Sequence, residues 1–141
     1  MRALLDTNVL ASGLIGLTQQ SKTASPLVLA RWNQEAFDLL ISEFVLGELE
    51  NVLQRPYFTR HISQNARVQI LQTPRIDAEI VVPDIVVIGI AKHREDDQVL
   101  SAAVSGNADY LVTGDAEFLR VREYQGVKLR TPAEFLRELD A

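Results

Sequence analysis

Short apolar runs alternate along the chain with longer segments in which apolar residues recur every three or four positions. The short runs, rich in Leu, Ile and Val, are typical of buried strands, and the longer segments are typical of amphipathic helices. This alternation predicts an α/β fold with three layers, α/β/α, around a central parallel sheet of about five strands. The expected strands are residues 3–5, 37–41, 80–82 or 85–88, 110–113 and 127–129.

Residues that favour helix ends mark several of the boundaries between these elements. Ser and Thr side chains cap helix N-termini, Pro suits the first helical turn, and Gly or Asn often ends a helix. We expect loose structure at residues 13–24 and a turn at 55–56, and we find no repeat or linker, so residues 1–141 are interpreted as a single domain. The expected boundaries are starts at Ser25-Pro26, Ser42, Ser63, near Asp97 and at the capping box Thr131-Pro132-Ala133-Glu134, and an end at Gly106-Asn107.

The composition narrows the class of protein. The 141 residues include no cysteine, which excludes disulfides, thiol nucleophiles and cysteine zinc sites. The apolar run at the N-terminus is interrupted by Asp6, and the run from Ile85 to Ala91 is too short to cross a bilayer. We therefore expect a cytoplasmic protein without a membrane partner. The formal net charge of -5 mildly opposes a surface that coats nucleic acid.

Acidic residues follow three of the expected strands. Asp6 comes directly after the first strand, Asp115 follows the fourth, and Asp96 and Asp97 lie in the first turn of the helix before it. Parallel strands place the residues beyond their carboxyl ends at one edge of the sheet. Converging carboxylates repel one another, and a bound divalent cation relieves that repulsion. Oxygen ligands without Cys or His favour Mg²⁺ or Mn²⁺ over Zn²⁺.

A fourth acid is expected from the helix after the second strand. In residues 43–53 the apolar positions form one stripe, and Glu48 and Glu50 flank it on opposite sides. Either glutamate could lean over the edge of the sheet, and the periodicity does not choose between them.

Four short motifs that contain these acids follow one another along the chain. They are Leu4-Leu5-Asp6-Thr7-Asn8, Glu48-Leu49 with Val52-Leu53, Asp97 with Leu100 and Ala102-Ala103, and Tyr110-Leu111-Val112-Thr113-Gly114-Asp115. Together they resemble the acidic blocks of PIN-domain nucleases. The tail, Gly126-Val127-Lys128-Leu129 followed by Thr131-Pro132-Ala133-Glu134, resembles in particular the VapC-like toxins of bacterial toxin–antitoxin systems. Four blocks in the same order along the whole chain are far more specific than one Asp-Thr-Asn.

The resemblance implies a metal site with defined members. It selects Glu48 over Glu50 and Asp97 over Asp96, because apolar residues follow the selected acids at the family's offsets. It places Thr113 and Asn8 in supporting positions. One departure is His93-Arg94-Glu95-Asp96, where relatives tend to carry Arg-Asp-Pro-Asp. The implied metal-binding and catalytic residues are Asp6, Glu48, Asp97 and Asp115.

The resemblance also implies an activity and partners. It indicates a Mg²⁺- or Mn²⁺-dependent endoribonuclease, a homodimeric toxin that acts on RNA and is held inactive by a cognate antitoxin. Basic residues such as Arg55 and Arg60 are candidate phosphate contacts, and Tyr57 is a candidate for stacking on a base. Two other hypotheses are a catalytically silent PIN-fold binding module and, on the strength of acids at strand ends alone, a Mg²⁺-dependent phospho-receiver domain.

Overall fold

A computed structural model, which describes all 141 residues, contains one central sheet of six strands in the order β3-β2-β1-β4-β6-β5. Every neighbouring pair is parallel except β5 and β6, which form an antiparallel hairpin. The predicted parallel α/β sheet is therefore confirmed, with one more strand because the two-residue β5 carries no readable apolar run. The strands are β1 (Arg2–Leu5), β2 (Asp38–Ser42), β3 (Glu79–Val81), β4 (Tyr110–Val112), β5 (Glu123–Tyr124) and β6 (Val127–Arg130).

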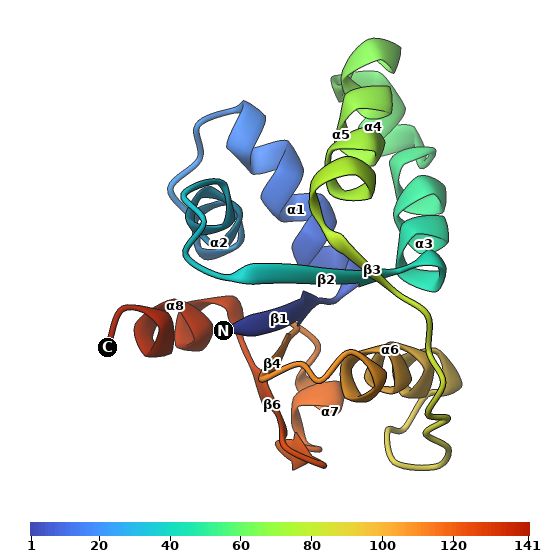
Figure 1. Ribbon diagram of the computed structural model, residues 1–141. Coiled ribbons are helices and arrows are strands. Elements are labelled where there is room, and N and C mark those ends of the chain that lie inside the picture. The colour runs from blue at the N-terminus through green and yellow to red at the C-terminus, as the bar shows by residue number, and fades with distance from the viewer.

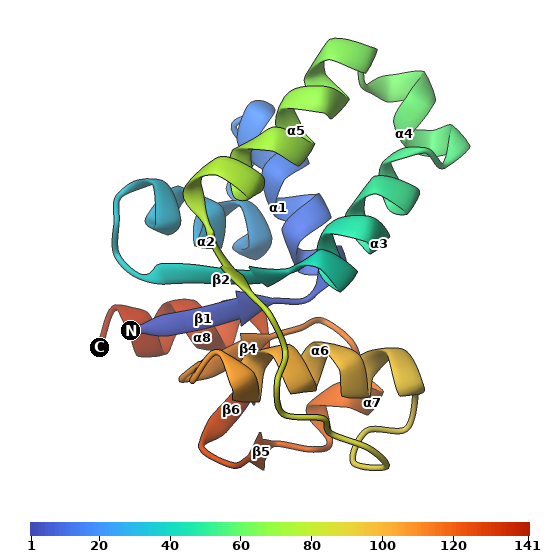
Figure 2. The same cartoon turned by 45° about the vertical axis from the view of Figure 1, so that its right-hand side comes forward.

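Helices cover the two faces of this sheet. In Figures 1 and 2, α1, α2, α3 and α5 lie on one side of the strands, and α6 and α7 lie on the other. This is the three-layer arrangement that alternating strands and helices produce. The helices are α1 (Thr7–Thr18), α2 (Ala24–Asn33), α3 (Glu43–Leu53), α4 (Pro56–His61), α5 (Gln64–Asp77), α6 (Arg94–Ser105), α7 (Ala116–Leu119) and α8 (Pro132–Leu139).

Most helix ends are where the capping residues predicted them. The side chains of Ser42 and Ser63 accept hydrogen bonds from the backbone N–H of the third residue of α3 and of α5, and Gly106 ends α6. α6 begins at Arg94, so that Asp96 and Asp97 lie in its first turn as predicted. One expectation is wrong: α2 begins at Ala24 after Thr23, and not at Ser25-Pro26. This difference of one or two residues is within the range over which helix ends vary.

The expected loose stretch from residue 13 is also wrong, because α1 continues to Thr18. Its two glycines are packing positions. A methyl group at Gly13 would collide with the Leu29 side chain, and one at Gly16 would collide with Pro26. Small residues here let α1 and α2 approach closely, and that tertiary contact outweighs the poor helix propensity of glycine.

The core is a continuous cluster of 35 buried apolar residues. Leu4, Leu40 and Leu111, at the centres of β1, β2 and β4, are fully buried because helices cover both sides of the sheet. None of the helices combines the length and the apolar character needed to cross a bilayer.

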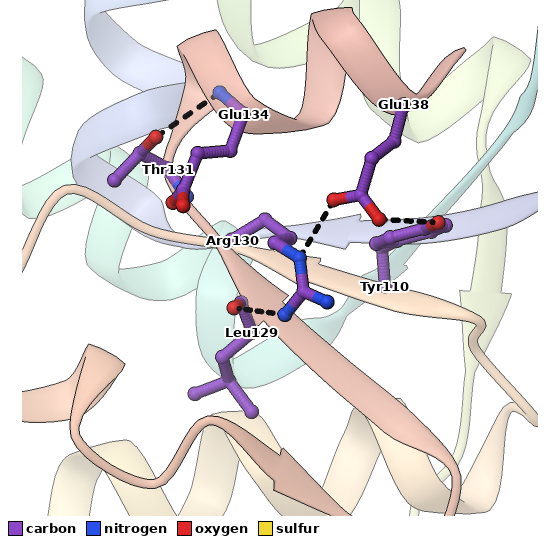
Figure 3. A network of polar contacts seen from close by, with 6 residues as sticks. All are labelled: Tyr110, Leu129, Arg130, Thr131, Glu134 and Glu138. Carbon is purple, nitrogen blue, oxygen red and sulfur yellow. Dashed lines mark hydrogen bonds and ion pairs between the residues drawn. The ribbon is translucent and has the colours of Figure 1, made fainter. Parts of the chain in front are cut away.

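A polar network fixes α8 against the neighbouring strands (Figure 3). Thr131 and Glu134 form the predicted capping box, with the Thr131 Oγ1 accepting from the Glu134 N–H at 3.1 Å. Farther along the helix, Glu138 accepts from the Arg130 Nε at 2.6 Å and from the Tyr110 hydroxyl at 3.3 Å. The fully buried Phe135 ring packs edge to face against the Tyr110 ring, with centroids 5.3 Å apart. The end of the chain is thereby attached to β4 and β6.

Candidate active site

An acidic cavity of about 290 Å³ lies beyond the carboxyl ends of β1 and β4. Four carboxylates line it, each from a different part of the chain. They come from the end of β1, from α3, from the first turn of α6, and from the loop after β4. The lining residues are Asp6, Thr7, Asn8, Glu48, Asn51, Val52, Arg55, Asp96 and Asp115.

Asp6 is the most enclosed of these acids and is held on both oxygens. Its Oδ1 accepts from the Thr7 N–H at 2.8 Å, which caps α1, and its Oδ2 accepts from the Thr113 hydroxyl at 2.8 Å. Burial raises the pKa of Asp6, and the nearby Asp115 raises it further, while the two hydrogen bonds oppose the rise. The charge on Asp6 is therefore costly without a cation.

Thr113 connects two of the acidic positions. It is completely buried, and its Oγ1 donates to Asp6 and accepts from the backbone N–H of Asp115 at 3.1 Å. Its own N–H donates to the carbonyl of Arg130 in the neighbouring strand. Asp115 is exposed, and its Oδ1 accepts from the Glu117 N–H at 2.9 Å, so that this carboxylate also caps α7. One hydroxyl thus sets the relative positions of the ends of β1 and β4.

Glu48 leans over the same cavity from α3. Its Oε1 accepts from the Thr7 hydroxyl at 2.7 Å. Burial raises the pKa of Glu48, with smaller contributions from the negative charges of Asp6 and Glu95, while the bond from Thr7 opposes the rise. Glu50, on the other flank of the apolar stripe, lines a separate groove with residues of α5. The structure therefore brings Glu48, and not Glu50, to the acidic cavity.

The two adjacent acids of α6 have different surroundings. Asp96 lines the cavity, and burial together with repulsion from Asp6 and Asp115 raises its pKa to about 6. Asp97, which the family resemblance selected, is absent from the lining and only 7% exposed. Its carboxylate accepts three backbone hydrogen bonds, from Gly89 at 2.8 Å, Ile90 at 3.2 Å and Ala91 at 2.8 Å. The expected position of Asp97 in the acidic cluster is thus taken by Asp96.

Asp97 belongs to a row of side chains that holds an extended segment along α6. Ser101 accepts from the N–H of Val87 at 2.8 Å, and Ser105 accepts from those of Asp84 and Ile85. Asp97, Ser101 and Ser105 are four residues apart, so they lie on one helix face. The N–H groups of Ile85 and Val87 are bonded to these side chains and not to a neighbouring strand, and residues 85–88 form no strand; of the two predicted positions, the strand β3 takes the first. The spacing of Asp97, Ser101 and Ser105 along the sequence was the feature from which this contact between the segment and α6 could have been predicted.

Two further polar residues of the cavity were not part of the predicted metal site. Arg55 and Asn51 both line it, and the Arg55 guanidinium forms no ion pair with any carboxylate. Asn8 lines the cavity as well. Arg55 precedes Pro56 at the start of α4 and was one of the candidate phosphate contacts, whereas nothing in the sequence singled out Asn51.

The cavity supplies suitable donors for a hard divalent cation. All four acids are oxygen donors, and burial and mutual repulsion raise the pKa values of Asp6, Glu48 and Asp96, so that their charges lack compensation. In the present arrangement, no three Asp, Glu or His side chains converge closely enough to enclose an ion. The chemistry of the site fits a cation, and the carboxylates would have to turn inward to coordinate it.

Comparison with known proteins agrees with this geometry. A family model described as "PIN domain" matches residues 2–117. The chain belongs to the PIN domain family. Among solved structures, this PIN domain is similar to the crystal structure of VapBC2 from Rickettsia felis bound to a DNA fragment from their promoter, with a TM-score of 0.60 and 18% identity. The match covers 93% of this chain and 98% of that chain. No curated protein matches the sequence.

Membership in the family gives the acidic cavity a functional context. PIN domains are generally nucleases. The likeness to VapBC2 extends over almost the whole chain, and at this identity it establishes the shared fold. The site residues of this PIN domain therefore have to be argued from its own geometry.

Proposed function

We propose that this PIN domain is a divalent-metal-dependent endoribonuclease that hydrolyses RNA phosphodiester bonds in the acidic cavity. The observation that carries the proposal is the gathering of four carboxylates, from β1, α3, α6 and the loop after β4, around one cavity of a nuclease fold. Arg55 is the only basic residue in the lining, and it pairs with none of them. Because little positive charge offsets these carboxylates, the cavity favours a cation over an anionic substrate alone.

The residues that we assign to metal binding are Asp6, Glu48, Asp96 and Asp115. This set retains three of the four acids implied by the family resemblance and replaces Asp97 by Asp96, which lines the cavity. Oxygen-only ligands favour Mg²⁺ or Mn²⁺. When bound, such an ion neutralises the negative charge of the phosphodiester and lowers the pKa of a water molecule near the scissile bond.

The protein's own part is to hold these acids in place. Thr113 orients Asp6 and positions the backbone of Asp115, while Thr7 orients Glu48. Asp97 anchors the segment before α6 and thereby supports the helix turn that carries Asp96. Such supporting hydrogen bonds fix the direction of metal-binding side chains. Asn8 borders the cavity from α1, where it can contact the substrate.

The proposal extends to partners. The similarity to VapBC2 and the resemblance of the motifs to VapC-like toxins support a role as the toxin of a toxin–antitoxin pair, with a cognate antitoxin protein as its inhibitor. We also propose that the toxin is a homodimer in the cytoplasm. Light scattering on the purified chain tests the homodimer, and a mass of 15.7 kDa, that of a single chain, would contradict it.

A cleavage assay tests the activity. Purified protein is incubated with defined single-stranded and structured RNAs in Mg²⁺, Mn²⁺ or EDTA, beside the Asp6→Asn variant. We expect cleavage with either metal, none in EDTA, and at least a hundredfold loss in the variant, since an amide keeps the shape and removes the charge. Equal cleavage by a folded Asp6→Asn protein would contradict the assignment of the site. Absence of both cleavage and Mn²⁺ binding would indicate a silent binding module.

A further inference from the structure

A second cavity, of about 540 Å³, continues from the acidic one. Asn8, Val52 and Arg55 line both cavities, so the two are adjoining parts of one depression. The second cavity lies between α1 and α4 and reaches the segment before α2. Its walls combine apolar surface, from Ala11, Ile15 and Phe58 among others, with hydroxyl and amide groups from Ser12, Gln19, Ser21 and Thr23.

Tyr57, on α4, presents an aromatic ring at this second cavity. It lines the cavity and is 64% exposed, although most large apolar side chains of the chain are buried. The ring stacks on His61 one helical turn later, with centroids 4.6 Å apart and planes at 26°, and meets Phe58 edge to face at 5.1 Å. The His61 Nδ1 lies 2.7 Å from the Tyr57 carbonyl, which holds the pair together. The Tyr57 ring is thus fixed in orientation before any ligand binds.

Arg55 lies between this ring and the acids. It is exposed, free of ion pairs and common to both cavities. An unpaired guanidinium beside an aromatic ring offers a phosphate contact next to a stacking surface, which is how single-strand binders hold successive nucleotides.

We infer that the second cavity binds the single-stranded RNA next to the scissile bond, with a base stacked on Tyr57 and the adjoining phosphate on Arg55. This inference rests on the proposed ribonuclease function and identifies unpaired RNA as its substrate, because a base inside a duplex cannot present its face to the ring. The unpaired Arg55 guanidinium and the mixed lining favour a nucleotide, which combines a charged phosphate with a flat base. An apolar protein segment would leave the guanidinium and the hydroxyl and amide groups of the lining without partners.

Binding of RNA tests the stacking contact. The probe is a set of fluorescein-labelled single-stranded RNA oligomers, followed by anisotropy with Ca²⁺ in place of Mg²⁺ to slow turnover. Loss of one stacked base corresponds to a decrease in affinity of about 5- to 150-fold. We expect this loss for Tyr57→Ala and near-parental affinity for Tyr57→Trp. Arg55→Ala should weaken binding and reduce the salt dependence by about one counterion. Arg137→Ala, which removes an exposed arginine on α8 outside both cavities, serves as control.

Oligomers with a single abasic position separate stacking from a merely structural effect. At the stacked position, removing the base should weaken binding to the parent but have no further effect on Tyr57→Ala. If the parent cleaves RNA and Tyr57→Ala binds every oligomer as tightly as the parent, the inference is overturned while the ribonuclease function stands. The second cavity would then be a binding site for a protein segment. If the parent neither binds nor cleaves RNA with metal, the proposed function fails and the inference fails with it.

Discussion

Asp96 and Asp97 are consecutive residues of α6 with opposite tasks: Asp96 lines the acidic cavity, and Asp97 accepts three backbone hydrogen bonds from residues 89–91. A helix turns by about 100° per residue, so neighbouring side chains cannot serve the same site. Asp96 therefore takes part in the repulsion between carboxylates in the cavity, whereas Asp97 stabilises the segment that precedes α6. The two residues should respond differently to substitution.

Asp97→Ala should destabilise the protein by about 2–4 kcal/mol, because three N–H groups lose a charged and largely buried acceptor. Asp96→Asn should leave the stability unchanged or raise it, since it removes repulsion from Asp6 and Asp115. Urea unfolding at pH 7.5 without metal measures both changes. A greater loss of stability in Asp96→Asn than in Asp97→Ala would contradict the assignment.

The raised pKa of Asp96 predicts a dependence on pH. The native carboxyl keeps its proton up to about pH 6, whereas the unfolded one loses it near the ordinary aspartate pKa of 3.8. The native state thus binds more protons between these values, and stability should fall as pH rises from 4 to 6. The fall should be below about 1 kcal/mol, because Asp96 is half-exposed and solvent screens its charge. The free energy of unfolding is measured for the metal-free parent and for Asp96→Asn from pH 4 to 6. The difference between the two proteins should change by that amount over this range. A constant difference would show that Asp96 has an ordinary pKa.

Metal affinity should change over the same range in the opposite direction. A carboxyl has to lose its proton before it binds a cation, so Mn²⁺ affinity should rise as pH increases through 6. Calorimetric titration at pH 5.5 and 7.5 measures this. An affinity independent of pH would exclude Asp96 from the ligands.

Thr113→Val should impair the site without unfolding the protein. The substitution keeps the shape and removes the hydroxyl that donates to Asp6, and because that bond lowers the pKa of Asp6, its loss raises the pKa further. A decrease of about 10- to 100-fold in metal affinity or cleavage is expected. Thr113→Ser, which keeps the hydroxyl, is the matched control. Equal activity of the Val and Ser variants would show that the hydrogen bond is dispensable.

The capping box of α8 should affect stability alone. Thr131→Ala removes the side chain that accepts from the Glu134 N–H, at an expected cost of about 1 kcal/mol. Since this network lies on β4, β6 and α8, away from the lining of the acidic cavity, Mn²⁺ affinity should not change. Thermal unfolding and a metal titration on the same sample measure the two effects.

The sequence was sufficient to predict the sheet, because apolar runs and caps such as Ser42 and Thr131 act locally. It was also sufficient to predict that Asp6 and Asp115 lie at one edge of the sheet, since each follows the carboxyl end of a parallel strand. The choice between Asp96 and Asp97 depends on where residues 84–91 run, which is a tertiary contact with α6. The extent of α1 likewise depends on how closely it packs against α2 through Gly13 and Gly16. Such contacts leave little periodic signal.

The most direct test of the metal-dependent ribonuclease compares Glu48→Gln with Glu50→Gln, two identical changes on one helix of which only the first alters the acidic cavity. The measurement is the rate of cleavage of a single-stranded RNA in Mn²⁺. We predict at least a hundredfold loss for Glu48→Gln and a parental rate for Glu50→Gln, with both proteins folded. Equal rates for the two variants, or a loss confined to Glu50→Gln, would contradict the account.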